Sequence, residues 1–342
     1  MIKWLDGAAI DQDVVVSTRI RVARNLSKYK FPLFMDPKEA DGLTNDILDT
    51  MKDVLKDNYR FIRTRDLPSM DQEVFVEKHL ISPNMIEHMD KSSFLLRDDE
   101  KATIMINEED HLRIQTLFSG FNLEEGWRLC SLIDDLLDEK LDYAYDEKWG
   151  YLTSCPTNVG TGLRASVMLH LPCISMTGNI NTIIEALRKI GLTARGLYGE
   201  GSEVTAYLYQ ISNQTTLGES EEEIIDKLNK VVHQIINRER SIRNYLKKEK
   251  NLEMEDRIYR SYGIISNSRI LSSKEAMEHL SNIRLGWAMG ILNHENFKDI
   301  MELMIDIQPA NIQKNFGKDM NIKERDIARA KIIREFILDL EG

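Results

Sequence analysis

The stretch that decides the fold is Val14-Val-Val-Ser-Thr-Arg-Ile-Arg-Val22, which is rich in β-branched residues and carries charges on alternate positions. This pattern is typical of a strand with one polar face. Because side chains two residues apart share a face of a strand, the pattern places Arg19 and Arg21 on the same side. Strand arginines are usually solvated, but several that converge could hold the phosphates of a nucleotide in bidentate fashion.

Outward from this strand, the first two thirds of the chain mix short apolar runs with helical patterns. Further strands are predicted at 75–81, 103–107, 167–171 and 204–211. Helices are predicted at 37–55, 123–139 and 180–190, the last ended by Gly191. Strands separated by more than hairpin turns, with helices packed on one side, indicate an α+β fold.

The pattern changes after Gly218. Residues 219–250 are predicted to form one long helix, with acidic residues first and basic residues last, as the helix dipole favours. From about Ser266 onward, Met, Leu and Ile recur at helical spacing with almost no strand signal. We therefore expect two domains, 1–255 and 256–342, the second a small all-α domain, with a boundary between about 250 and 265.

Composition narrows the class of protein. The 342 residues carry a net charge of −11 and are 42% hydrophobic and 30% charged, which argues against a disordered or membrane protein. The first residues lack a signal-type apolar core, and the three cysteines, Cys130, Cys155 and Cys173, lack metal-binding spacing. We expect a cytoplasmic protein with no membrane partner, no direct nucleic-acid partner and no dedicated metal site.

The strongest local signal of a ligand site is Cys155-Pro-Thr-Asn-Val-Gly-Thr-Gly-Leu-Arg164. Its two glycines, Gly160 and Gly162, would let the backbone approach a ligand closely. A cysteine ahead of a loop that ends in arginine lies in a positive field, which favours the thiolate. The alternative is a buried structural cysteine beside an ordinary turn.

Acidic residues form a second signal. Glu108, Glu109 and Asp110 follow a strand-like run and precede Arg113, and Glu200 lies in a Gly-flanked loop after Arg195. Such acidic residues are more often solvated surface. Near an arginine-rich phosphate site, however, two carboxylates make more sense if the phosphoryl acceptor is itself a cation.

Three segments, Ser17-Thr-Arg-Ile-Arg21, Asn107-Glu-Glu-Asp-His-Leu-Arg113 and Cys155 to Ala165, together resemble the signatures of the ATP:guanidino phosphotransferases. That family includes creatine kinases, arginine kinases and bacterial protein-arginine kinases. The resemblance covers about residues 12–245 and implies a phosphagen-kinase-like antiparallel sheet flanked by helices, with ATP and Mg²⁺ as cofactors. It implies that Glu109 is the catalytic carboxylate, that Cys155 contacts the guanidinium, and that Glu200 binds an arginine acceptor.

The same resemblance implies a set of nucleotide-binding positions, of which the five arginines would clamp the phosphates. They are Ser17, Thr18, Arg19, Ile20, Arg21, His79, Arg113, Arg164, Ala165, Ser166, Val167, Met168, Arg195, Gly196, Leu197, Tyr198 and Gly199. Phosphagen kinases also carry an N-terminal helical domain of about a hundred residues before this first segment, where this chain has sixteen. Without it the acceptor side should be more open, as a protein substrate requires.

The segment Arg325-Asp-Ile-Ala-Arg-Ala330 lies in a helical pattern, so Arg325 and Arg329 share a face. The pair could hold a phosphate and Asp326 a guanidinium, although an exposed, salt-bridged helix shows the same pattern. The segment is similar to the phosphoarginine-sensing motif of protein-arginine kinases, which implies an allosteric site at Arg325, Asp326, Arg329 and Ala330.

The sequence therefore predicts phosphorylation of arginine side chains in proteins, and two alternatives stay open: a kinase for free arginine, and a non-catalytic regulator that binds phosphoarginine. The resemblance implies a stress-response role, in which protein substrates are marked for a Clp-type ATPase and protease. It further implies regulation of a heat-shock repressor, a zinc-binding activator protein and assembly as a dimer or larger homo-oligomer.

Overall fold

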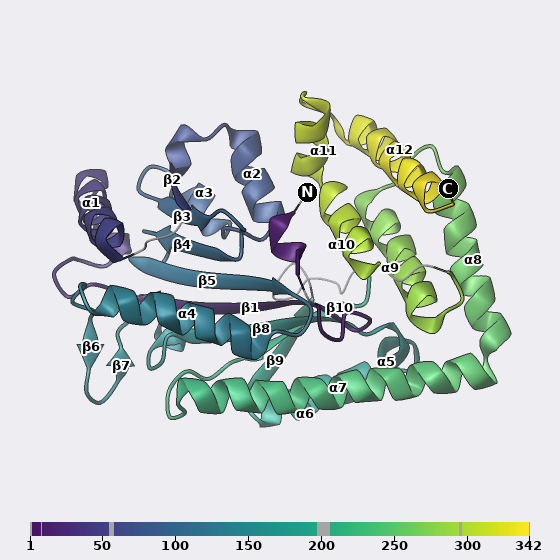
Figure 1. The fold of residues 1–342 in the computed structure, drawn as a ribbon, viewed down its shortest axis with the longest axis horizontal. Helices are drawn as coiled ribbons and strands as arrows, with labels where there is room; N and C mark the ends of the chain where they lie inside the picture. Colours follow the sequence, from purple (N-terminus) through teal and green to yellow (C-terminus); the bar gives the residue numbers. More distant parts are fainter. Residues whose placement is uncertain (1, 8, 55–57, 197–205, 294–295, 342) are drawn as a thin grey trace.

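The structure is a computed structural model that describes residues 2–7, 9–54, 58–196, 206–293 and 296–341. At its centre is an eight-stranded antiparallel sheet in the order β2-β3-β4-β5-β1-β8-β10-β9 (Figure 1). The strands are β1 Val15–Arg24, β2 Tyr59–Arg63, β3 Ser93–Arg97, β4 Ala102–Ile106, β5 Leu112–Ser119, β8 Leu163–His170, β9 Leu192–Gly196 and β10 Leu208–Asn213. Strands β6 (Tyr145–Asp146) and β7 (Gly150–Tyr151) pair separately.

Helices from both halves of the chain surround the sheet. They are α1 Pro37–Val54, α2 Ser69–Glu77, α3 Asn84–Glu87, α4 Leu123–Asp138, α5 Pro172–Met176, α6 Ile180–Lys189, α7 Glu221–Glu249, α8 Asn251–Asn267, α9 Ser273–Met289, α10 Phe297–Asp306, α11 Pro309–Phe316 and α12 Ile322–Glu341. Short 3₁₀ helices lie at Lys3–Leu5, Pro32–Phe34, Thr64–Asp66 and Pro156–Asn158. The long helix α7 begins at a capping box in which Ser220 and Glu223 satisfy each other's backbone N–H groups.

One face of the sheet packs against α1, α4 and α7, which lie along the lower and left sides in Figure 1. Alternate residues of β1, including Ile20 and Val22, are fully buried in this core. Arg24, at the end of β1, is also buried here, and its Nη2 lies 2.5 Å from Asp134 Oδ2 on α4. Because a buried charge needs a partner, this ion pair fixes α4 against the strand.

The apolar core on the other face includes residues of α2, the N-terminal 3₁₀ helix and the C-terminal helices α9, α10 and α12. Val16, Met168 and Leu208 of the sheet share one apolar cluster with Leu280 of α9 and Ile300 of α10. The C-terminal helices thus share a core with the sheet. The predicted boundary at 255/256 falls inside α8, and the division into two domains stays a prediction.

Most predicted elements are present, but some differ from the prediction. The strand predicted at 75–81 is wrong: this segment ends α2 and then turns at His79, whose φ is +61°. The last predicted strand begins later, at Leu208, because Ala206 and Tyr207 have φ of +60° and +56° and cannot extend the ladder. Helices cover both faces of the sheet, where the sequence predicted one. Among the described helices, none is long and apolar enough to cross a membrane.

Candidate active site

The register of the sheet gathers cations on the face opposite Ile20. Arg19 and Arg21 project from this face of β1, and Arg21 lies directly opposite Arg164 of β8. On the neighbouring strand β5, Gln115 lies opposite Arg21, and Arg113 is two residues before Gln115. Like charges directly opposite each other destabilise a sheet. The face is therefore favourable when an anion neutralises these side chains.

The pKa values of Arg19 and Arg21 indicate that a bound anion would stabilise their charged forms. Burial, with the nearby charges of Arg164 and Arg113, lowers the pKa of Arg19 to about 10. Burial and then the charge of Arg19 lower the pKa of Arg21 well below its ordinary value. The Nε of Arg21 is buried without a hydrogen-bond partner in the part of the chain that the structure describes. A polyphosphate would supply both the charge and the acceptors, so these residues fit ATP.

The edge of the sheet extends this face. Arg195 of β9 lies opposite Gln210 of β10, so the two share the face. Gln210 Oε1 accepts a hydrogen bond of 3.1 Å from Arg19 Nη2, which orients that guanidinium. Ser166 pairs with Arg19 across β1 and β8, and Gly196 ends β9. The predicted site residues Leu197, Tyr198, Gly199 and Glu200 lie outside the described residues.

A cavity of about 150 Å³ brings the predicted acceptor site together. Arg21, Arg113, Arg164, Glu109 and Cys155 line it. Arg113 Nη2 lies 3.3 Å from Glu109 Oε2, and Cys155 Sγ lies 3.0 Å from Thr157 Oγ1. Burial raises the pKa of Glu109 above its ordinary value. A carboxylate with a raised pKa accepts a proton more readily, which suits it to act as a base.

Two acidic neighbours of Glu109 hold this cavity in shape, a role that was not predicted for them. Asp110 Oδ1 accepts hydrogen bonds of 2.6 Å from Asn25 Nδ2 and from the backbone N–H of Ser154, so it ties the Cys155 segment to the Glu109 turn. Glu108 Oε1 lies 2.6 Å from Arg113 Nη1 and fixes that guanidinium. The available signal was an acidic triplet placed directly after a fully buried strand.

Gly160 and Gly162 of the Cys155 loop are required by the fold, and Gly162 also lines this cavity, so the prediction that they let a ligand approach stays a prediction. Gly160 and Gly162 have φ of +112° and +64°. A Cβ at Gly160 would lie 2.1 Å from the carbonyl oxygen of Thr216, and one at Gly162 would lie 2.6 Å from that of Ala23. Both positions need glycine because other backbone segments already fill the space.

A second cavity, of about 350 Å³, adjoins the first because Arg21 lines both. Ser17, Arg19, His79 and Met168 line it together with side chains of the C-terminal helices α9 and α10. Burial, with the charge of Arg19, lowers the pKa of His79 to about 4, so its imidazole is neutral near pH 7. An apolar cavity that ends in arginines suits a nucleotide.

Four predicted nucleotide-binding residues do not reach either cavity. Thr18, Ile20, Ala165 and Val167 alternate with the site residues along β1 and β8, and their side chains are buried on the opposite face. The Thr18 hydroxyl donates instead to the carbonyl of Gly120. The prediction for these side chains is corrected, since the period of a strand points them away from the site.

The two arginines of the C-terminal motif are hydrogen-bonded within the protein. The Arg329 side chain is 2% exposed and donates hydrogen bonds to the carbonyls of Ile307 and Leu271 and to Asp326 Oδ1. Ala330 is fully buried, which corrects its assignment as a contact residue. Arg325 is half-buried and donates to the carbonyl of Met320. The phosphoarginine-sensing role of the motif stays a prediction.

No group of three or more His, Cys, Asp or Glu side chains within the described ranges is arranged to hold a metal ion.

Family models match most of the chain. The model of the ATP:guanido phosphotransferase C-terminal catalytic domain matches residues 42–242. The model of the protein-arginine kinase McsB C-terminal domain matches residues 251–342.

Curated relatives match nearly the whole chain. A protein-arginine kinase of Halothermothrix orenii is 50% identical over 97% of this chain and 95% of its own length. A protein-arginine kinase of Brevibacillus brevis is 45% identical over 99% of this chain and 96% of its own length.

Solved structures match about 70% of the chain. Lombricine kinase is similar with a TM-score of 0.59 and 25% identity, over 71% of this chain and 70% of that one. The duplicated taurocyamine kinase of Schistosoma mansoni is similar with a TM-score of 0.61 and 26% identity, over 70% of this chain and 35% of that longer chain. The fold is that of the phosphagen kinases, with an all-helical C-terminal region.

Proposed function

This chain belongs to the ATP:guanido phosphotransferase family and is therefore a kinase, and from that premise we propose that it phosphorylates arginine side chains of proteins. The observation that carries the proposal is the cavity in which Arg21, Arg113 and Arg164 face Glu109 and Cys155. Cations on one side suit the γ-phosphate of ATP, and a carboxylate and a thiol on the other suit a guanidinium acceptor.

The acceptor must lose a proton during transfer, because an arginine guanidinium is protonated at neutral pH and is a poor nucleophile. As the N–P bond forms, the bond from the γ-phosphorus to the β–γ bridging oxygen breaks and ADP leaves. Glu109, whose pKa is raised by burial, accepts the proton. Cys155 lies beside it and adds a second contact for the guanidinium, and Glu200 is proposed to complete the carboxylate pair.

The arginines of the sheet stabilise the charge on the transferring phosphoryl group. They are held in place before ATP arrives, Arg19 by Gln210 and Arg113 by Glu108, so little reorganisation is needed. Mg²⁺ would supply further neutralisation of the phosphates. Catalysis on this proposal is positioning plus electrostatic stabilisation.

The biological setting is proposed from the family resemblance. Arginine phosphorylation would mark cytoplasmic proteins for a Clp-type ATPase and protease and would regulate a heat-shock repressor under stress. A zinc-binding activator protein, assembly as a homo-oligomer and allosteric activation by phosphoarginine at Arg325 and Arg329 belong to the same proposal.

The test is incubation with ATP, Mg²⁺ and an unfolded protein, followed by mass spectrometry for acid-labile phosphate on arginine. Glu109→Gln keeps the shape of the site and removes the base, so the modification should disappear with it. Stoichiometric ADP release with free arginine, and no phosphorylated protein, would favour a free-arginine kinase. No transfer to either acceptor would refute the proposal.

A further inference from the structure

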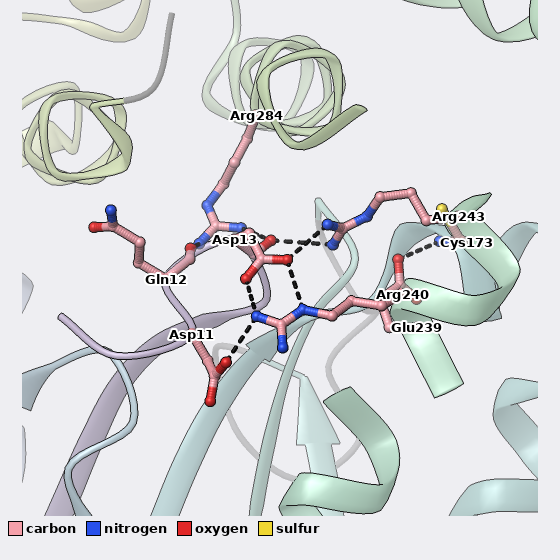
Figure 2. Close-up of polar contacts among 8 residues, drawn as sticks. All are labelled: Asp11, Gln12, Asp13, Cys173, Glu239, Arg240, Arg243 and Arg284. Carbon is pink, nitrogen blue, oxygen red and sulfur yellow. Dashed lines mark hydrogen bonds and ion pairs between the residues drawn. The ribbon is translucent and has the colours of Figure 1, made fainter. Parts of the chain in front are cut away.

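A partly buried cluster of charged side chains joins α9 to the segment just before β1 (Figure 2). Arg284 of α9 is fully buried and donates hydrogen bonds to the backbone carbonyls of Gln12 and Asp13. The Asp13 carboxylate in turn pairs with Arg240 and Arg243 of α7. Residues 12–13 are therefore hydrogen-bonded to α9 and ion-paired to α7 at the same time, which links both helices to the segment that leads into β1.

From this position α9 and α8 hold the turn that leads into β10. The Ser281 hydroxyl of α9 donates 2.9 Å to the carbonyl of Ala206. Arg257 of α8 donates 2.7 Å from Nη2 to the hydroxyl of Tyr207 and 2.9 Å from Nε to Asn282 Oδ1 of α9. Both α8 and α9 therefore contact this turn, and Arg257 also joins the two helices to each other.

This turn needs such support because its backbone is unfavourable. Ala206 and Tyr207 both have positive φ, a conformation that non-glycine residues adopt at an energetic cost. Three residues after Tyr207, within β10, Gln210 accepts the hydrogen bond from Arg19 Nη2. The chain of contacts therefore runs from the C-terminal helices through the turn and β10 to a phosphate-facing arginine.

We propose that Arg257 and Ser281 are positioning residues for ATP binding, acting through the Ala206–Tyr207 turn and Gln210 on Arg19. This inference rests on the proposed function only in taking ATP as the ligand of the sheet-face arginines. It assigns the C-terminal helices a part in building the nucleotide site, besides any regulatory role.

The test measures the dissociation constant of Mg·ATP by calorimetry, without any acceptor. Tyr207→Phe removes only the hydroxyl that Arg257 binds, and Arg257→Ala removes its partner. Each should weaken ATP binding about fivefold, the scale of one hydrogen bond. Arg260→Ala is the matched control: Arg260 lies on the same helix, is 74% exposed and pairs only with Asp256 among the described residues, so ATP binding should not change.

A double-mutant cycle separates positioning from general loosening of the fold. In a Gln210→Ala background, Tyr207→Phe should have little further effect on ATP binding, because the contact chain is already broken. Unchanged binding in both Tyr207→Phe and Arg257→Ala, or fully additive effects with Gln210→Ala, would overturn the inference. A chain that binds ATP but phosphorylates no arginine refutes the proposed function and leaves this inference standing; a chain that binds no ATP overturns both.

Discussion

Two groups of buried arginines in this protein differ in what neutralises them. On the sheet face, Arg19 and Arg21 lie beside Arg164, and their pKa values are lowered by burial and then by the charges of neighbouring arginines. In the C-terminal helices, Arg329 is buried too, but it binds Asp326 and two backbone carbonyls. A buried cation with its acceptors filled stabilises the fold, whereas a cluster of cations without enough acceptors is arranged for an external anion.

The comparison predicts opposite consequences of losing an arginine in each group. Removal of a sheet-face arginine should weaken function and spare the fold, because it relieves repulsion. Removal of Arg329 should weaken the fold, because it leaves Asp326 and two carbonyls buried without their donor.

The largest expected effect is on catalysis. Arg21→Ala should lower kcat/KM for ATP about 10³-fold, or about 4 kcal/mol, because a cation that contacts the transferring phosphoryl group is lost. The melting temperature should stay the same or rise. Steady-state kinetics and thermal unfolding of the same preparation measure both, with exposed Arg60→Ala on β2 as the control. A marked fall in melting temperature with normal kinetics would show that Arg21, like Arg329, stabilises the fold and does not serve catalysis.

The next effect is on stability. Arg329→Ala should lower the free energy of unfolding by about 3 kcal/mol, since breaking a buried pair leaves its partner without compensation. Urea unfolding measures it. Lys331→Ala, on the same helix with a half-exposed and weak ion pair, should change it by less than about 0.5 kcal/mol. If Arg329→Ala is as stable as the wild type, the two groups do not differ as argued.

A slightly smaller effect follows from supplying the missing anion. Inorganic tripolyphosphate at a hundred times its dissociation constant should stabilise the wild type by about 2.7 kcal/mol through mass action. Arg21→Ala should gain much less, while Arg329→Ala should gain as much as the wild type. Unfolding curves with and without tripolyphosphate decide this. Equal stabilisation of all three proteins would mean that the anion binds elsewhere.

The sequence predicted the sheet face well because a strand has a simple period. The alternation around Ile20 places Arg19 and Arg21 together, and the structure confirms it. The same period could have excluded Thr18 and Ile20, which entered the predicted site only because they belong to a matching motif. The segment 75–81 was misread because a short apolar run does not distinguish a strand from the end of a helix.

Burial in the C-terminal region could not be predicted in the same way. The partners of Arg329 include carbonyls of Leu271 and Ile307, which are far away in sequence, so the helical spacing of the motif gives no sign of them. Likewise, Gly160 is required by the backbone of Thr216, a neighbour that only the folded chain reveals.

The smallest expected effect is the pH dependence of activity, which distinguishes Glu109 from His79 as the group that titrates. Glu109 must be deprotonated to act as base, and its pKa is raised, so kcat/KM should fall as the pH drops towards a value above 4.5, the ordinary pKa of the group. His79, with a pKa of about 4, is neutral across this range. His79→Gln should therefore weaken ATP binding yet leave the acid limb in place. If kcat/KM falls only at or below pH 4.5, burial does not raise the pKa of Glu109. If the pH of this fall changes in His79→Gln, the titrating group is the histidine.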